Sequence, residues 1–145
     1  MSIRLSSEEI QYIHLFESIT GAAAKDCIII PEEDRIIFLV YPGHIGVAIG
    51  REGKNIRQLK SLLKKNIEIV EFSQNLRRFV QNCFRTVKIL DINIETDNSG
   101  TKKLLKVIVR PEDKGLAIGK NKRNLTRAKI LLKRHFKIDD VIITS

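Results

Sequence analysis

Apolar residues recur along this chain first at helical spacing and then in short β-branched runs. Between residues 10 and 19 they form a helical stripe, which a Ser-x-x-Glu capping box at residues 6–9 precedes and Gly21 follows, so this segment is predicted to be a helix. Runs at 27–30 and 35–40 flank the turn sequence Pro-Glu-Glu-Asp, which predicts a β-hairpin. The same patterns predict a short helix at 44–49, a helix that begins at Lys54 and a strand at 67–72.

The second half of the chain repeats this order of elements. An Asn and a Gly between its first two strands tolerate the positive φ of a turn. The order helix-strand-strand-helix-helix-strand therefore occurs twice, and each copy has the strands for a small three-stranded sheet. The predicted elements are a helix at 75–84, strands at 87–95 and 104–109, a short helix at 112–118, a helix at 123–135 and a strand at 138–144.

A shift of 69 positions superimposes the two halves in sequence. Eleven of the 25 residues from Val40 to Lys64 are identical to those at 109–133, without a gap. This repeat predicts an α/β (α+β) protein with two copies of one unit, in domains at 1–72 and 73–145. Little sequence remains between them for a flexible linker, so we expect the copies to pack at a fixed angle.

Residues 49–56, Ile-Gly-Arg-Glu-Gly-Lys-Asn-Ile, place a glycine turn in front of a predicted helix. The N–H groups at a helix start attract anions, and a Cβ at Gly50 or Gly53 would hold a sugar-phosphate chain away from the backbone. A P-loop alignment fails, because Ala48 stands at its first glycine and Asn55 at its magnesium-binding hydroxyl. A dinucleotide-binding fingerprint also fails, because the glycine spacing is wrong and a helical segment precedes the turn.

This turn and its surroundings resemble the KH family, which has an Ile-Gly-x-x-Gly-x-x-Ile signature between two helices. In that family the Gly-x-x-Gly loop clamps the backbone of about four nucleotides of a single strand. A hairpin before the helix pair and one strand after it is similar to the type II, prokaryotic form of the KH fold. The resemblance implies RNA contacts in the first copy for Ile49, Gly50, Arg51, Glu52, Gly53, Lys54, Ile56 and Arg57.

The second copy departs from that signature. Residues 118–125 are Ile-Gly-Lys-Asn-Lys-Arg-Asn-Leu, so Lys122 replaces the second glycine. A side chain there is expected to hinder close approach of a backbone, but three cations at 120, 122 and 123 are offered to phosphate groups. Our hypothesis is that copy one grips a strand by geometry and copy two mainly by charge. The implied RNA contacts in copy two are Gly119, Lys120, Asn121, Lys122, Arg123 and Arg127.

Two interpretations stay open for the apolar residues around the first glycine turn. In a KH domain the bases lie over an apolar groove formed by the helix before the loop and the adjoining strand. The same residues are equally compatible with an ordinary core. Because the chain has no Trp and few aromatic residues, recognition of bases on an aromatic-lined sheet is disfavoured. The groove candidates are Ile45, Val47, Ile49 and Ile56, with Phe38 or Val40.

The net charge of +9 is confined to one half of the chain. Residues 1–72 carry a net charge of −1, whereas residues 73–145 carry +10. Such an excess favours a polyanionic partner, which is a nucleic acid or an acidic protein or membrane surface. No apolar run is long enough to span a bilayer and no signal-peptide core is present, so we expect a cytoplasmic protein that is not bound to a membrane. Cys27 and Cys83 are expected to be buried free thiols.

No residue pattern supports an enzyme. His14, His44 and His135 lack partners at triad or ligand spacing, so neither a cofactor nor a metal is expected. Two type II KH domains in tandem look like the archaeal family of NusA-like transcription factors, over almost the whole chain. This resemblance implies a factor that binds single-stranded RNA, the nascent transcript, and acts on RNA polymerase during elongation and termination; we expect a monomer. Two alternatives share these residues, a ribosomal or RNA-processing KH protein and a protein adaptor with a near-neutral first half.

Overall fold

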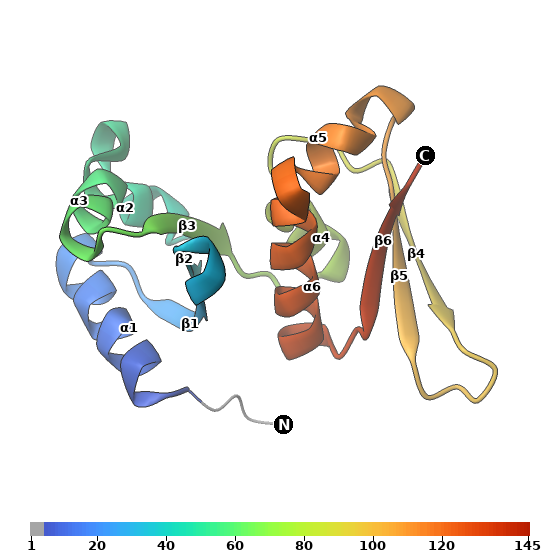
Figure 1. The fold of residues 1–145 in the computed structure, drawn as a ribbon, viewed down its shortest axis with the longest axis horizontal. Helices are drawn as coiled ribbons and strands as arrows, with labels where there is room; N and C mark the ends of the chain where they lie inside the picture. Colours follow the sequence, from blue (N-terminus) through green and yellow to red (C-terminus); the bar gives the residue numbers. More distant parts are fainter. Residues whose placement is uncertain (1–4) are drawn as a thin grey trace. The chain divides into compact units, whose positions relative to one another are not determined.

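The computed structural model describes residues 5–145, whose contacts divide the chain into two compact units after Ser73. The two units are described separately, and Figure 1 shows the elements of each. The predicted domain limit, after residue 72, lies one residue from this division. The fixed angle expected between the copies stays a prediction.

The first unit packs three helices on one face of a three-stranded sheet (Figure 1). Its central strand, β2, runs antiparallel to β1 and parallel to β3. Phe38 on β2 lies between Cys27 and Ile69 in this register, so the three side chains share the face that the helices cover. The elements are α1 (Ser7–Thr20), β1 (Ala24–Ile30), β2 (Arg35–Val40), α2 (Ile45–Ile49), α3 (Lys54–Leu63) and β3 (Asn66–Glu71).

The second unit repeats this architecture. Strand β5 is central, antiparallel to β4 and parallel to β6, and Leu105 on β5 lies between Ile94 and Val141. The two mixed sheets and the repeated element order confirm the predicted fold class. The elements are α4 (Leu76–Cys83), β4 (Asp91–Thr96), β5 (Lys103–Ile108), α5 (Lys114–Ile118), α6 (Arg123–Phe136) and β6 (Asp140–Thr144).

The start of β4 differs from the prediction, which placed a strand from residue 87 onward. Strand pairing begins only at Asp91, because the side chain of Gln81 on α4 binds the preceding backbone. Its Nε2 donates to the carbonyl oxygen of Val87 at 2.8 Å, and its Oε1 accepts the N–H of Ile89 at 3.0 Å. These bonds replace a strand ladder with contacts to a helix. β-Branched composition alone could not reveal this competition.

Two stacked phenyl rings form the centre of the first core. Phe16 of α1 and Phe38 of β2 are fully buried, with ring centroids 4.3 Å apart and planes inclined by 19°. Helix α1 is positioned by the predicted capping box, in which Ser6 Oγ accepts the Glu9 N–H at 3.1 Å and Glu9 Oε1 accepts the Ser6 N–H at 2.7 Å. The stack therefore joins the first helix to the central strand.

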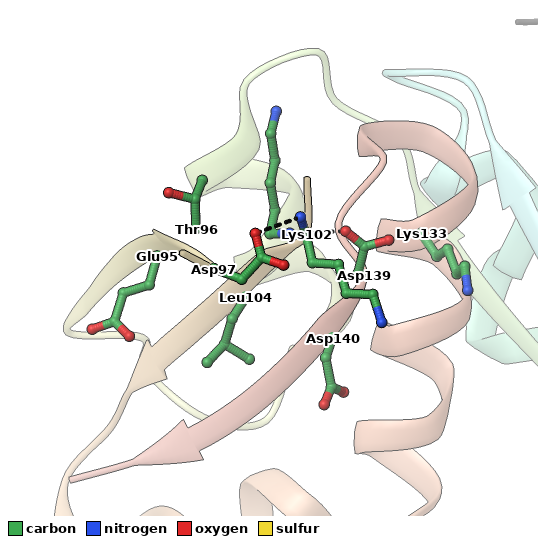
Figure 2. A pocket seen from close by; sticks show the side chains of 9 residues that line it. Glu95, Thr96, Asp97, Lys102, Leu104, Lys133, Asp139 and Asp140 are labelled. Atoms are coloured by element: carbon green, nitrogen blue, oxygen red, sulfur yellow. Dashed lines mark hydrogen bonds between the residues drawn. The ribbon is translucent and has the colours of Figure 1, made fainter. Parts of the chain in front are cut away.

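The loop between β4 and β5 is organised by one carboxylate. Asp97 Oδ1 accepts the backbone N–H of Thr101 at 2.9 Å and of Lys102 at 3.2 Å, and the Ser99 hydroxyl donates to the same group. Figure 2 shows Asp97 facing Lys102 at the edge of a surface pocket of about 600 Å³. The Lys102 N–H, the largest contributor, and these other donors hold the pKa of Asp97 below its ordinary value.

Replacement of Phe16 by Ala is expected to destabilise the first unit by about 3–5 kcal/mol, because it leaves a cavity against Phe38. Urea denaturation of the variant and of the parent measures this difference. Leu62→Ala on α3 is the matched control, since Leu62 is 56% exposed and its truncation should cost no more than about 0.5 kcal/mol. Equal losses for the two variants would contradict the assigned core.

Acidification is expected to loosen the loop that Asp97 organises. The pKa of Asp97 is lowered in the folded chain, so its contribution to loop stability is present above the ordinary carboxyl value of 3.8 and is lost as the pH falls below it. Hydrogen exchange at the Thr101 and Lys102 amides, corrected for intrinsic rates, measures the loss. Protection should stay constant from pH 7 to about 5 and then fall; in Asp97→Asn no such transition should occur.

Candidate nucleic-acid interface

The predicted Gly-x-x-Gly loop of the first unit is a tight turn between α2 and α3. Gly50 ends α2 with φ 81° and ψ 168°, and the next three residues form a single 3₁₀ turn. Glu52 and Gly53 have φ values of 55° and 74°, in the left-handed region. The turn closes through the Gly53 N–H, which donates to the Gly50 carbonyl oxygen at 3.0 Å. The exposed side chains of Arg51 and Lys54 stand on either side of it.

An asparagine side chain fixes this loop to the helix before it. Asn55 Nδ2 donates to the carbonyl oxygen of Val47 at 2.8 Å. A Cβ at Gly50 would lie 2.8 Å from Cγ and Nδ2 of Asn55, closer than atoms can approach, and the φ of 81° is itself unfavourable for other residues. Glycine is therefore required at position 50 by the internal packing of the loop. Access for a ligand, the reason expected from the sequence, is not needed to explain it.

The second unit builds the same loop with a different sequence. Gly119 has φ 81° and ψ 165°, and Asn121 has φ 55° and ψ 30°, within a few degrees of their counterparts in the first unit. Asn124 Nδ2 donates to the carbonyl oxygen of Leu116 at 3.1 Å, and a Cβ at Gly119 would lie 2.9 Å from that nitrogen. The sequence repeat aligned the two asparagines but gave no sign of their function, which depends on the three-dimensional path of the turn.

Lys122 adopts the conformation of the glycine that it replaces. Its φ of 61° and ψ of 25° lie close to the values of 74° and 17° at Gly53, and its N–H donates to the Gly119 carbonyl oxygen at 3.0 Å. A left-handed conformation costs a residue with a side chain about 1–2 kcal/mol, so the rest of the loop must stabilise it. The second unit thus keeps the backbone of the loop and adds an exposed cation, beside exposed Lys120 and Asn121.

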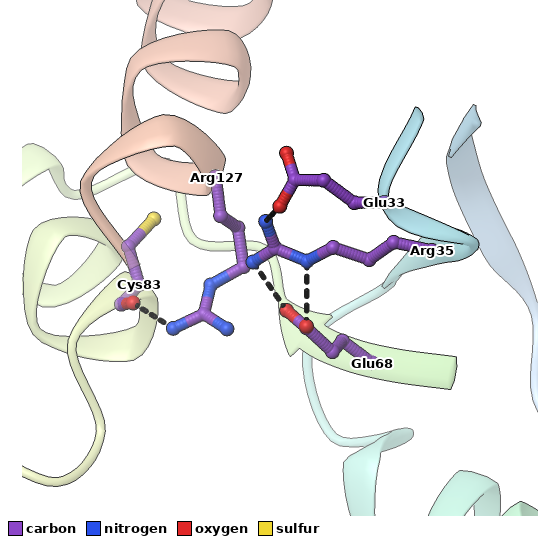
Figure 3. Close-up of polar contacts among 5 residues, drawn as sticks. All are labelled: Glu33, Arg35, Glu68, Cys83 and Arg127. Atoms are coloured by element: carbon purple, nitrogen blue, oxygen red, sulfur yellow. Dashed lines mark hydrogen bonds and ion pairs between the residues drawn. The ribbon is translucent and has the colours of Figure 1, made fainter. Parts of the chain in front are cut away.

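Two of the arginines expected to contact RNA are bonded inside their own units. The Arg57 guanidinium donates to the carbonyl oxygen of Glu52, across the base of the first loop. Arg127 Nη2 donates to the carbonyl oxygen of Cys83 at 2.7 Å and so ties α6 to α4 (Figure 3). Arg123 is partly buried at the start of α6. RNA contacts by these three residues stay predictions.

Arg35 is another cation that the fold itself uses. Its Nε and Nη2 donate to the two carboxylate oxygens of Glu68 at 2.6 and 2.9 Å, and Nη1 donates to Glu33 at 3.3 Å (Figure 3). This forked pair joins β2 to β3 in the first sheet. The charge of Arg35 is therefore largely neutralised where it stands.

The groove candidates separate into core residues and exposed residues. Phe38 and Val40 are fully buried, so the interpretation that they line a groove for bases is wrong. Val47 on α2 is 53% exposed beside the first loop, and Leu116, 69 positions later on α5, is 55% exposed beside the second. Leu116 was not predicted, although the repeat would have identified it. The remaining candidates, partly buried against the core of the first unit, are Ile45, Ile49 and Ile56.

The potentially reactive side chains have structural roles. Cys27 and Cys83 are buried free thiols, as expected, and burial raises the pKa of Cys83 to about 12. His44 Nδ1 accepts the backbone N–H of Ala23 at 2.9 Å, which anchors the start of α2. Between residues 5 and 145 no group of three or more His, Cys, Asp or Glu side chains is arranged to hold a metal. Over the same range no helix has the length and apolar character needed to cross a membrane.

Comparison with known proteins assigns a KH domain to each half of the chain. Residues 10–74 match the KH domain family, and residues 76–144 match the family of the NusA-like second KH domain. A crystal structure of a protein named APE1850 superimposes with a TM-score of 0.87 at 44% sequence identity, over 97% of this chain and 100% of that one.

Full-length relatives are found among archaeal proteins. The chain is 37% identical over 144 residues to the "probable transcription termination protein NusA" of Halobacterium salinarum, covering 99% of this chain and 100% of the relative. It is 31% identical to the protein of the same name from Methanocaldococcus jannaschii, over 96% of this chain and 74% of that protein. The chain therefore belongs to the archaeal NusA-type transcription termination proteins, a non-enzymatic family built here from two KH domains.

Proposed function

We propose that this chain binds single-stranded RNA of the nascent transcript through both KH loops, and that it contacts RNA polymerase during elongation and termination. The observation that carries the RNA-binding proposal is the identity of the two loop backbones, from Gly50 to Gly53 and from Gly119 to Lys122, despite different side chains. A conformation maintained at the cost of left-handed residues is typical of a functional loop. The proposed site of action is the cytoplasm, as expected from the sequence.

In this proposal each loop receives the sugar-phosphate backbone of the strand. Arg51 and Lys54 supply positive charge in the first unit, and Lys120 and Lys122 supply it in the second. Because Lys122 preserves the turn, the hypothesis that copy two works mainly by charge is revised: both copies offer the same geometry, and the second adds electrostatic attraction. The net charges of −1 and +10 on the two halves support this division.

The bases would then lie over the exposed aliphatic side chains beside the loops. Val47 and Leu116 occupy equivalent positions on α2 and α5, and each is more than half exposed. An exposed large apolar side chain at the same place in both copies supports a shared contact. Aliphatic contacts of this kind select weakly among bases, so we propose broad sequence tolerance.

Position 53 and its counterpart 122 allow RNA binding to be tested by exchanging glycine and lysine on the same loop backbone. Gly53→Lys should keep the left-handed turn, as Lys122 does, at a stability cost of about 1–2 kcal/mol and with a small shift of Arg57, whose Nη1 lies 3.3 Å from the position of the new Cβ. The variant should tighten binding and steepen the salt dependence by about 0.7 per added phosphate contact. Lys122→Gly should do the opposite. The dissociation constant for oligouridylate, measured from low to moderate salt, gives both slopes. Unchanged slopes in both variants would refute phosphate binding at the loops.

The polymerase contact is expected to survive the loss of RNA binding. Gly53→Asp/Lys122→Asp places a carboxylate in each loop, where Asp tolerates left-handed φ and repels phosphate. We expect more than tenfold weaker RNA binding, with RNA polymerase still recovered by the tagged variant from an RNase-treated archaeal extract. Recovery of ribosomal proteins by the parent protein, with no polymerase, would favour the alternative of a ribosomal KH protein.

A further inference from the structure

A basic surface on the second unit lies outside both loops. Arg77 and Arg78 on α4 are both exposed, and we call these two residues the α4 basic patch; Arg85 and Lys88, in the segment that follows α4, are exposed as well. Residues 73–90 contain no Asp or Glu. Arg77 and Arg78 line an open surface pocket of about 660 Å³ together with Ile89. The patch therefore combines two adjacent exposed guanidinium groups with a hollowed surface.

Helix packing places the start of this patch far from the second loop. Phe79, near the start of α4, packs on Phe136 at the end of α6, with ring centroids 5.3 Å apart. Cys83, at the end of α4, accepts the bond from Arg127 near the start of α6. The two helices therefore run in opposite directions. Arg77 and Arg78 lie towards the far end of α6 from Lys122, which is about 20 Å for a helix of 14 residues.

The two arginines are not explained by the stability of α4. Ser6 and Asn75, 69 positions apart, both cap their helices by accepting the backbone N–H of the residue three positions later, although only α1 adds the return bond from a glutamate. The first turn of α1 then carries Glu8 and Glu9, which suit the positive end of a helix, whereas the same positions in α4 carry arginines, which do not. The preference for acidic residues at a helix start is thus met in the first copy and reversed in the second.

Ion pairing within the fold also leaves most of this charge uncompensated. Arg77 pairs with Asp91 at 2.9 Å, but both side chains are more than half exposed, so the pair is weak. The side chains of Arg78, Arg85 and Lys88 form no ion pair with any residue in the range 5–145. By contrast Gln81, which lines the same pocket, is fully engaged with the backbone of residues 84–89.

We propose that the α4 basic patch is a second binding surface for the phosphate backbone of single-stranded RNA. This inference rests on the proposed function of the loops, because the strand held there would continue to the patch. A KH loop holds about four nucleotides, so further nucleotides of the same strand can reach a surface about 20 Å away. Guanidinium groups suit phosphate because their donors form a planar fork that binds two oxygens together.

The test measures how removal of the patch charge changes affinity for a short and for a long RNA. Arg77→Gln/Arg78→Gln should bind oligouridylate of about five nucleotides like the parent, because this length fills one loop. For about 20 nucleotides its affinity should fall about three- to tenfold, and the salt slope should fall by about 0.7 for each lost phosphate contact. The matched control Lys102→Gln/Lys103→Gln removes two exposed lysines, one at the end of the loop between β4 and β5 and one at the start of β5, and should show neither change.

Three outcomes would overturn the inference. If Arg77→Gln/Arg78→Gln has the same salt slope and the same dependence on RNA length as the parent, the patch does not bind RNA. An equal loss in the lysine control means that net charge alone is responsible. If polyglutamate binds the parent protein but not Arg77→Gln/Arg78→Gln, while both bind long RNA equally, the partner of the patch is an acidic protein segment. Thermal melting and Arg77→Lys/Arg78→Lys, which retains the charge and should retain most of the affinity, exclude misfolding as the cause.

Failure of the loop proposal is recognised separately. If Gly53→Asp/Lys122→Asp binds RNA of both lengths as tightly as the parent, the loops are not the RNA site and the proposed function fails. If that variant loses RNA of both lengths while Arg77→Gln/Arg78→Gln loses neither, only the inference about the α4 basic patch fails.

Discussion

The hydrogen bond from an asparagine side chain to a carbonyl oxygen of the preceding helix is the constraint on which both candidate binding loops depend. Asn55 reaches back to Val47 and Asn124 to Leu116, across the space that a Cβ on the first glycine would occupy. This bond explains why glycine is present at both 50 and 119. Once it is made, the path of the turn is set, and the following helix begins in a defined direction.

A backbone held in this way leaves the outer side chains of the loop free to differ. The first copy has Arg-Glu-Gly after its glycine and the second has Lys-Asn-Lys, yet the conformations agree residue by residue. The charge of the loop can therefore change while its backbone conformation stays the same. The cost is the left-handed conformation of Lys122, which the rest of the loop must stabilise.

The distribution of arginines shows the difference between structural and available charge. Arg35 and Arg127 are consumed by bonds within their own units, one to a carboxylate and one to a carbonyl oxygen. Arg77 and Arg78 stand at a helix start that disfavours them and have little compensation nearby. Net charge counts all four arginines equally. It therefore overestimates the positive charge that is accessible to an anion near α6, and it does not reveal the accessible arginines on α4.

The repeat, the order of elements, the mixed α/β class and the position of both loops could all be predicted from the amino-acid pattern. Apolar periodicity and the capping box at Ser6 depend on residues close together in sequence, and the 69-residue repeat depends on comparing the chain with itself. Periodicity predicts helices and strands well because each element buries one face. The start of β4, the accessibility of the groove candidates and the availability of each arginine became known only from the folded arrangement. These outcomes depend on which groups meet in space: Gln81 competes for the backbone before β4, the helices cover Phe38, and Arg127 meets a carbonyl oxygen 44 residues away in sequence.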